Sequence, residues 1–138
     1  MTLPIVDSSI AIAWCSKSQA SPRSDAALDA AMNFGILVPT HFQLEVANSL
    51  WQLERRNKIE AAKVDEFLGW LSEIDTDVDP TAQTATATLI LPIARRFDLT
   101  IYDAAYLELA LRTNLPLATR DDALQRAAEK AGAILFSD

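Results

Sequence analysis

The chain has 138 residues, of which 50% are hydrophobic and 22% are charged. It is therefore long enough to bury a substantial core, and its composition excludes a disordered protein. Its formal net charge of −7 argues against a protein that holds nucleic acid through phosphate neutralisation alone, although bound divalent cations would offset part of that charge.

The first third of the chain predicts short apolar strands separated by helices. Residues 3–7 predict a buried strand, and residues 8–15 continue as a short helix. A second helix follows, which Ser21 caps and Gly35 ends. Residues 36–38 predict the next strand, because they form a short β-branched and apolar run that a proline closes.

The middle of the chain predicts a helical hairpin. Residues 40–56 form the longest amphipathic segment, and a second helix extends from there to residue 74 after a break. The first helix carries a second apolar stripe, opposite its core face, formed by Leu44, Ala47 and Trp51. This stripe predicts either an interface with another chain or cover by the second helix of the hairpin.

The rest of the chain continues the alternation of strand and helix. Its expected elements are a short strand around Val78, a helix over 81–97 that Pro92 kinks or divides, a helix over 103–112, a strand over 116–119, a helix over 122–131 and a strand over 134–136. Short apolar strands that alternate with helices imply an α/β fold with a parallel sheet covered on both faces. Ligands of such sheets bind beyond the carboxyl ends of the strands. We expect one domain over residues 1–138.

Four acidic residues are expected at this edge of the sheet. Asp7 ends the first strand, Asp121 follows the strand at 116–119, Asp103 opens a helix, and Glu45 lies in the first turns of the long helix. Each aspartate could instead only cap a helix, and Glu45 could be a solvated helix acid. If the four converge, their mutual repulsion calls for a cation, and an all-oxygen donor set suits Mg²⁺ or Mn²⁺. One ion or two would fit.

Other catalytic chemistries lack the residues that they need. His41 is the only histidine, so cleavage of RNA by a pair of histidines is excluded. No nucleophile elbow accompanies His41, and no G-x-x-x-x-G-K loop is present to bind phosphate. The acids therefore favour metal-dependent hydrolysis of a phosphodiester.

The cysteine content and the hydropathy pattern indicate the cellular compartment in which we expect the protein. Cys15 is the only cysteine, which excludes an intrachain disulfide and suits a reducing cytoplasm. We find no signal peptide at the N-terminus. The longest apolar stretch, residues 85–94, is too short to span a bilayer. We expect a cytoplasmic protein with no membrane partner.

Four motifs together resemble PIN-domain ribonucleases, and most closely the VapC-type toxins of bacterial toxin–antitoxin pairs. In chain order they are Asp7-Ser-Ser, Glu45-Val-Ala-Asn48, the run from Leu99 to Ala110 around Asp103, and Leu117-Ala-Thr-Arg-Asp121. The likeness covers almost the whole chain. It implies a PIN-like three-layer α/β/α sandwich with a five-stranded parallel sheet of strand order 3-2-1-4-5, and a homodimer.

The resemblance also implies an activity and its partners. Asp7, Glu45, Asp103 and Asp121 would be the catalytic acids that bind Mg²⁺, or Mn²⁺ in its place, in an endoribonuclease. A small antitoxin would inhibit the enzyme by wrapping the helical hairpin and placing a basic side chain in the acidic pocket. Two alternatives stay open: a metal-dependent phosphoesterase that acts on DNA or nucleotides, and a non-catalytic PIN module that binds RNA or a protein partner.

Residues near the four acids have supporting roles in this hypothesis. Ser8 and Thr119 would contribute hydroxyl groups, Asn48 would be a polar neighbour of Glu45, and Asp122 would be an accessory acid or a helix cap. The candidates for contact with RNA phosphates are Arg120, beside Asp121, and Arg112. Ordinary solvated arginine is the alternative for both.

Overall fold

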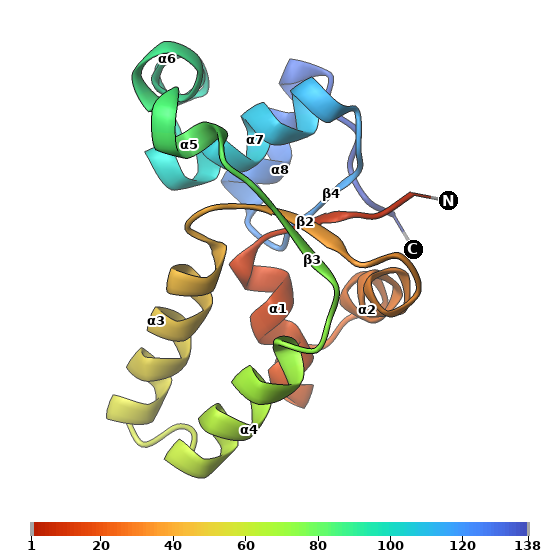
Figure 1. Ribbon diagram of the computed structural model, residues 1–138, viewed down its shortest axis with the longest axis vertical. Helices are drawn as coiled ribbons and strands as arrows, with labels where there is room; N and C mark the ends of the chain where they lie inside the picture. Colours follow the sequence, from red (N-terminus) through yellow and green to blue (C-terminus); the bar gives the residue numbers. More distant parts are fainter. Residues whose placement is uncertain (1, 138) are drawn as a thin grey trace.

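A four-stranded parallel sheet forms the centre of the computed structural model, which describes residues 2–137. The strands are β1 (Ile5–Val6), β2 (Ile36–Pro39), β3 (Thr76–Asp79) and β4 (Leu117–Ala118). Their order is β3-β2-β1-β4, and every neighbouring pair is parallel. Helices flank the sheet on both sides, with α1 to α4 below it and α5 to α8 above it in Figure 1. All strands therefore end at one edge.

The expected fifth strand is not formed as a strand, and this prediction was wrong in part. Residues 134–136 lie beside β4 in the predicted position, but they pair through a single parallel bridge between Leu117 and Leu135. Two backbone hydrogen bonds of 2.9 Å support the bridge, from Leu117 N–H to Ile134 O and from Phe136 N–H to Leu117 O. Because β4 itself is only two residues long, it offers too little backbone for a longer ladder.

The helices around β1 and β2 begin and end where the sequence predicts. Helix α1 (Ser8–Cys15) is followed by a short 3₁₀ turn, η1 (Lys17–Gln19), and by α2 (Pro22–Phe34). Ser21 caps α2 through a reciprocal pair of bonds with Ser24. Gly35 then takes a φ of 81°, and its Cα hydrogen faces Asp75 so closely that a Cβ there would lie 2.7 Å from the Asp75 carbonyl oxygen.

The helical hairpin consists of α3 (Phe42–Arg55) and α4 (Ala61–Leu71). Phe42, Val46 and Leu50 on α3 are buried, as the core stripe predicts. Of the second stripe, Leu44 and Trp51 are 75% and 49% exposed. Helix α4 therefore leaves most of this stripe uncovered, and only Ala47 lies in the groove between the two helices.

Residues 81–97 form three short helical pieces in place of one kinked helix. They are α5 (Thr81–Thr84), a π-helical turn η2 (Thr86–Ile90) and α6 (Leu91–Phe97). Pro92 occupies the first turn of α6, where a missing N–H is tolerated. The wider turn of η2 absorbs the interruption just before the proline.

Helix α7 (Ile101–Thr113) packs against the sheet and is the most buried helix of the core. Every residue from Ala104 to Ala110 is buried. The helix starts two residues earlier than expected, because Thr100 caps it by accepting a hydrogen bond of 3.1 Å from the Asp103 N–H. Helix α8 (Asp122–Ala131) follows β4 and ends at Gly132. No helix in residues 2–137 is long and apolar enough to cross a membrane.

Candidate active site

The four predicted acids lie at the edge where the parallel strands end. Asp7 directly follows β1, and Asp121 lies three residues beyond β4. Glu45 lies in the first turn of α3, which begins soon after β2, and Asp103 lies in the first turn of α7. Since the carboxyl ends of parallel strands meet at one edge, the chain directions alone bring these elements together.

Asp7 is held by hydroxyl groups and by the start of α1. Its Oδ1 accepts a hydrogen bond of 2.6 Å from the Ser9 hydroxyl and one of 3.1 Å from the Ile10 N–H. Its Oδ2 accepts a hydrogen bond from the Thr119 hydroxyl, which in turn accepts the N–H of Asp121 at 3.0 Å. Asp7 is only 4% exposed and Thr119 only 1%.

The environment of Asp7 makes its carboxyl group harder to ionise in the metal-free protein. The pKa of Asp7 is raised to about 6, mainly by burial and to a smaller extent by the nearby Asp103 carboxylate. The hydrogen bonds from Ser9, Thr119 and Ile10 act in the opposite direction and lower the pKa, because they stabilise the anion. Desolvation is the larger effect.

Two ring-bearing residues, Tyr106 and His41, lie beside the Glu45 carboxylate. Its Oε1 accepts a hydrogen bond of 2.9 Å from the Tyr106 hydroxyl, and His41 Nε2 lies 3.3 Å from the same oxygen. Burial raises the pKa of Glu45 to about 7, and both Asp103 and Asp7 add to the increase. The Tyr106 bond lowers this pKa but does not offset the burial.

His41 packs between two tyrosine rings, at centroid distances of 5.3 Å to Tyr102 and 5.2 Å to Tyr106. Its Nε2 is 3.2 Å from the Tyr102 carbonyl oxygen. Because a carbonyl and a carboxylate both accept hydrogen bonds, Nε2 is the ring nitrogen that carries the proton. Burial lowers the pKa of His41, which favours the neutral ring. The hydrogen bond of Nε2 is to the Tyr102 carbonyl oxygen, and Glu45 Oε1 is a close neighbour at 3.3 Å.

Asp103 and Asp121 are the other two acids of the group. Burial, followed by the charge of Asp121, raises the pKa of Asp103. Asp121 is exposed, and it caps α8 by accepting a hydrogen bond of 2.8 Å from the Leu124 N–H. The charge of Asp103 thus acts on Asp7 and Glu45, and that of Asp121 acts on Asp103.

The chemistry of this donor set fits a hard divalent cation. Burial and the charge of a neighbouring acid raise the pKa of each of three carboxyl groups, Asp7, Glu45 and Asp103, and a nearby cation would oppose that effect. All the donors are oxygens, which Mg²⁺ and Mn²⁺ prefer. Within residues 2–137 no three acidic, histidine or cysteine side chains already form a metal cluster. Binding an ion therefore requires these carboxylates to reorient toward it.

Several predicted supporting residues do not join this group. The hydroxyl that bonds Asp7 belongs to Ser9 in place of Ser8. Asn48 is exposed one turn beyond Glu45, and Asp122 is exposed as the first residue of α8. Arg112 lies at the opposite end of α7 from Asp103, nine residues or about 14 Å away along the helix.

Arg112 has a structural environment of its own. Its guanidinium group donates to both carboxylate oxygens of Glu108, at 2.8 and 3.1 Å, and to Asp79 at 2.9 Å. These bonds join α7 to the end of β3. Arg112 stays a predicted contact for RNA phosphates, at a distance from the acids.

Arg120 does lie beside the acids. Its N–H donates to the Ser9 hydroxyl oxygen at 2.8 Å, so the backbone of this residue is tied to the network around Asp7. Its exposed guanidinium donates to the Gln19 side-chain oxygen at 2.9 Å. The residues that sequence reasoning missed are Ser9, Tyr106 and Gln19. Of these, Ser9 belongs to the Asp7-Ser-Ser motif and Tyr106 to the run from Leu99 to Ala110, whereas Gln19 lies in none of the four motifs.

Known proteins are similar to this chain in sequence and in fold. The chain is 34% identical to Ribonuclease VapC3 of Mycobacterium tuberculosis over 97 residues, in each of two strains, CDC 1551 / Oshkosh and ATCC 25618 / H37Rv. The aligned part covers 70% of this chain and 67% of that protein. The fold also matches the crystal structure of PAE2754 from Pyrobaculum aerophilum, with a TM-score of 0.71 at 24% identity over 98% of this chain and 84% of the other.

A family model described as PIN domain matches residues 5–130. The matched segment contains all four acids and every strand of the sheet. The chain therefore belongs to the PIN-domain family.

Proposed function

We propose that this protein is a metal-dependent endoribonuclease, and that it is the toxin of a toxin–antitoxin pair. The observation that carries the proposal is the coupling of Asp7, Glu45 and Asp103, three desolvated carboxyl groups at the carboxyl edge of a PIN-domain sheet. The similarity to Ribonuclease VapC3 supports RNA as the substrate. Asp121, coupled to Asp103, is the fourth catalytic acid in this proposal.

In this proposal some residues bind the metal ion and others orient these ligands. Asp7, Glu45, Asp103 and Asp121 would hold Mg²⁺ or Mn²⁺, which when bound supplies an activated water and charge stabilisation at the leaving oxygen. Ser9 and Thr119 fix the Asp7 carboxylate in one direction. Tyr106 donates a hydrogen bond to the Glu45 carboxylate, and His41 lies next to it. In this proposal Arg120 contacts a phosphate beside Asp121.

The proposed protein partners concern the exposed face of α3. Leu44 and Trp51 are large apolar side chains that are 75% and 49% exposed. Such side chains on one face of a helix suit an interface with another chain. We propose that this face takes part in binding the cognate antitoxin, in a cytoplasmic protein that forms a homodimer.

One experiment separates this function from its alternatives. Purified protein is incubated with RNA, with DNA and with nucleotides, each with Mg²⁺ and with excess chelator. Cleavage of RNA alone, only in the presence of metal, is the expected result. Metal-dependent cleavage of DNA or nucleotides would favour the wider phosphoesterase. A failure to cleave any substrate, combined with retained RNA binding, would identify a non-catalytic module.

A further inference from the structure

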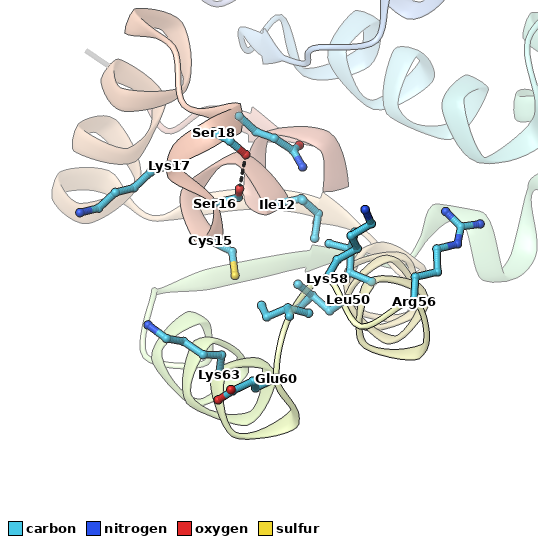
Figure 2. A pocket seen from close by; sticks show the side chains of 13 residues that line it. Ile12, Cys15, Ser16, Lys17, Ser18, Leu50, Arg56, Lys58, Glu60 and Lys63 are labelled. Atoms are coloured by element: carbon cyan, nitrogen blue, oxygen red, sulfur yellow. Dashed lines mark hydrogen bonds between the residues drawn. The ribbon is translucent and has the colours of Figure 1, made fainter.

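A second hollow of the molecule lies away from the acids, at the far end of α1. It has a volume of about 780 Å³ and is enclosed by the end of α1, by η1 and by the α3–α4 hairpin. Its floor is apolar and includes Ile12, Leu50 and Leu53. Figure 2 shows the Cys15 sulfur directed into this space, toward the hairpin. We call this hollow the basic cleft, for the charges around it.

Four cationic side chains surround the basic cleft: Lys17, Arg56, Lys58 and Lys63. In Figure 2, Lys17 and Lys63 lie on one side of Cys15 and the other two on the opposite side. They are a third of the 12 lysines and arginines of a chain with a net charge of −7. None of the four forms an ion pair with a carboxylate within residues 2–137.

Such a concentration of unpaired positive charge has an electrostatic consequence. The lysine at position 63 acts on the Cys15 thiol and opposes the increase in its pKa that burial causes, so its charge reaches into the basic cleft. Like charges around one hollow repel one another, and an anionic ligand relieves that repulsion. Glu60 is the only acid that lines the basic cleft, which leaves a clear excess of positive charge.

A chain of contacts joins the basic cleft to the acids. Gln19 lines the basic cleft, and its side-chain oxygen accepts the hydrogen bond from Arg120. The N–H of Arg120 donates to Ser9, whose hydroxyl donates to Asp7. Helix α1 links the two regions directly, because it starts beside Asp7 and ends at the basic cleft. Its eight residues span about 12 Å.

We propose that the basic cleft binds the phosphate backbone of single-stranded RNA that flanks the bond to be cleaved. This inference rests on the proposed function. It adds the surface on which the RNA beside the cleaved bond binds. A few nucleotides of a single strand cross the distance of about 12 Å between the acids and the basic cleft. The cations contact phosphates, and the aliphatic floor packs against sugars or bases.

An acidic protein segment is the competing occupant. The continuity with Asp7 favours RNA, because a substrate whose phosphate lies at the acids must leave the site along a nearby surface. The contacts that pass through Arg120 and Gln19 lead from the acids to this hollow, where four cations form no ion pair within residues 2–137.

The test measures RNA binding apart from cleavage. Fluorescence anisotropy is recorded in chelator with labelled oligoribonucleotides of 4 and 12 nucleotides. The cleft variant combines Lys17→Gln, Lys58→Gln and Lys63→Gln, which are all exposed side chains. The control variant combines Arg96→Gln, Arg126→Gln and Lys130→Gln, which line a separate hollow of about 370 Å³ and remove the same charge.

The wild type is expected to bind the 12-mer at least tenfold more tightly than the 4-mer. The cleft variant should lose this difference, and the slope of log K against log salt should become shallower by about 2, since each lost phosphate contact contributes about 0.7. The control variant should keep both properties within about twofold. If the cleft variant does not fold, Lys58→Gln alone should still reduce the slope by about 0.7.

Three results would overturn the inference. The two variants could lose RNA affinity equally, which would show a non-specific effect of charge. The wild type could bind both lengths equally. The cleft variant could also keep its RNA affinity and lose only its binding to poly-glutamate, which would identify a docking site for acidic protein. Cleavage with Mg²⁺ is assayed separately, so an inactive wild type would contradict the proposed function without deciding where RNA binds.

Discussion

At the scale of single residues, the acids combine two roles that the sequence left as alternatives. Asp7 and Asp121 do cap helices, through the N–H groups of Ile10 and Leu124. Asp103 does not, because Thr100 takes the capping position of α7. Asp103 is thus the acid whose replacement tests the site with the least disturbance of a helix terminus.

We expect Asp103→Asn to reduce RNA cleavage by at least about 100-fold, since loss of a metal ligand costs no less than loss of a group that orients one. Without metal, the variant should unfold at the same temperature or slightly higher, because the substitution removes repulsion among the carboxylates. Cleavage rates and thermal unfolding measure the two effects. Asp122→Asn, at an exposed position of α8, is the matched control and should stay active. An Asp103→Asn variant with full activity would show that the proposed metal site is wrong.

The raised pKa of Glu45 predicts how stability depends on pH. Between its ordinary value of 4.5 and about 7, the folded metal-free protein binds more protons than the unfolded chain. The stabilisation is complete below pH 4.5 and is lost as the pH rises through 7. Asp7, with its pKa of about 6, acts in the same direction.

The free energy of unfolding of the metal-free wild type should therefore fall between pH 5 and pH 8. In Glu45→Gln, where the side chain is neutral at every pH, the fall should be smaller. Denaturant unfolding at both values measures it, with the exposed Glu66→Gln as a control that behaves like the wild type. An equal fall in Glu45→Gln and the wild type would show that Glu45 ionises normally.

At the scale of helices and strands, local patterns predicted most of the fold. The positions of the first four strands and of the helices between them follow from short apolar runs, caps and glycines. The order of these strands in the sheet was implied by the family resemblance, and the structure confirms it. The fifth strand could not be predicted correctly, because its formation depends on how much backbone β4 offers. The start of α7 was also missed, since an aspartate at position 103 satisfies the same preference as a cap at Thr100.

The candidate site was harder to predict from the sequence than the fold was. The acids follow from the ends of strands, but their orienting groups depend on geometry across the chain. Tyr106 meets Glu45 over a separation of 61 residues, and no local pattern indicates that bond. Ser8 and Ser9 are equivalent in the motif, and only the direction of the first turn of α1 brings the second hydroxyl to Asp7.

The turn between α2 and β2 gives a prediction about the stability of the folded protein. At Gly35, a Cβ would meet the Asp75 carbonyl, and φ is positive. Gly35→Ala should therefore lower the free energy of unfolding by about 1–3 kcal/mol. Gly69, inside α4, has no atom within 4 Å of such a Cβ. Gly69→Ala should be neutral or stabilising by up to about 1 kcal/mol. Denaturant unfolding compares the two, and equal effects would mean that the Gly35 turn can relax.

At the scale of the whole molecule, charge is distributed unevenly. Acids concentrate at the carboxyl edge of the sheet, and unpaired cations surround the basic cleft at the other end of α1. A divalent cation would offset part of the negative charge of the first region and leave the second free for a polyanion. The negative net charge is therefore compatible with an RNA substrate once the metal is bound.

This arrangement predicts that metal stabilises the folded protein. Millimolar Mg²⁺ or Mn²⁺ should raise the melting temperature of the wild type by several degrees, because an ion that binds only the folded state shifts the equilibrium toward it. Asp103→Asn should show a smaller increase. Sodium chloride at the same ionic strength is the control for screening. A rise of equal size with sodium would mean that the acids repel one another without forming a specific site.

The hydrogen bond between Asp7 and Thr119 has a consequence for how this protein could change over evolution. It joins the residues that follow β1 and β4, two strands that share only two pairs of residues. A mutation at Asp7 would loosen the sheet as well as remove a catalytic acid, and it would expose cells to a misfolded chain. Inactive descendants that remain folded are therefore expected to arise through changes at Glu45 or Asp103, which hold no strands together.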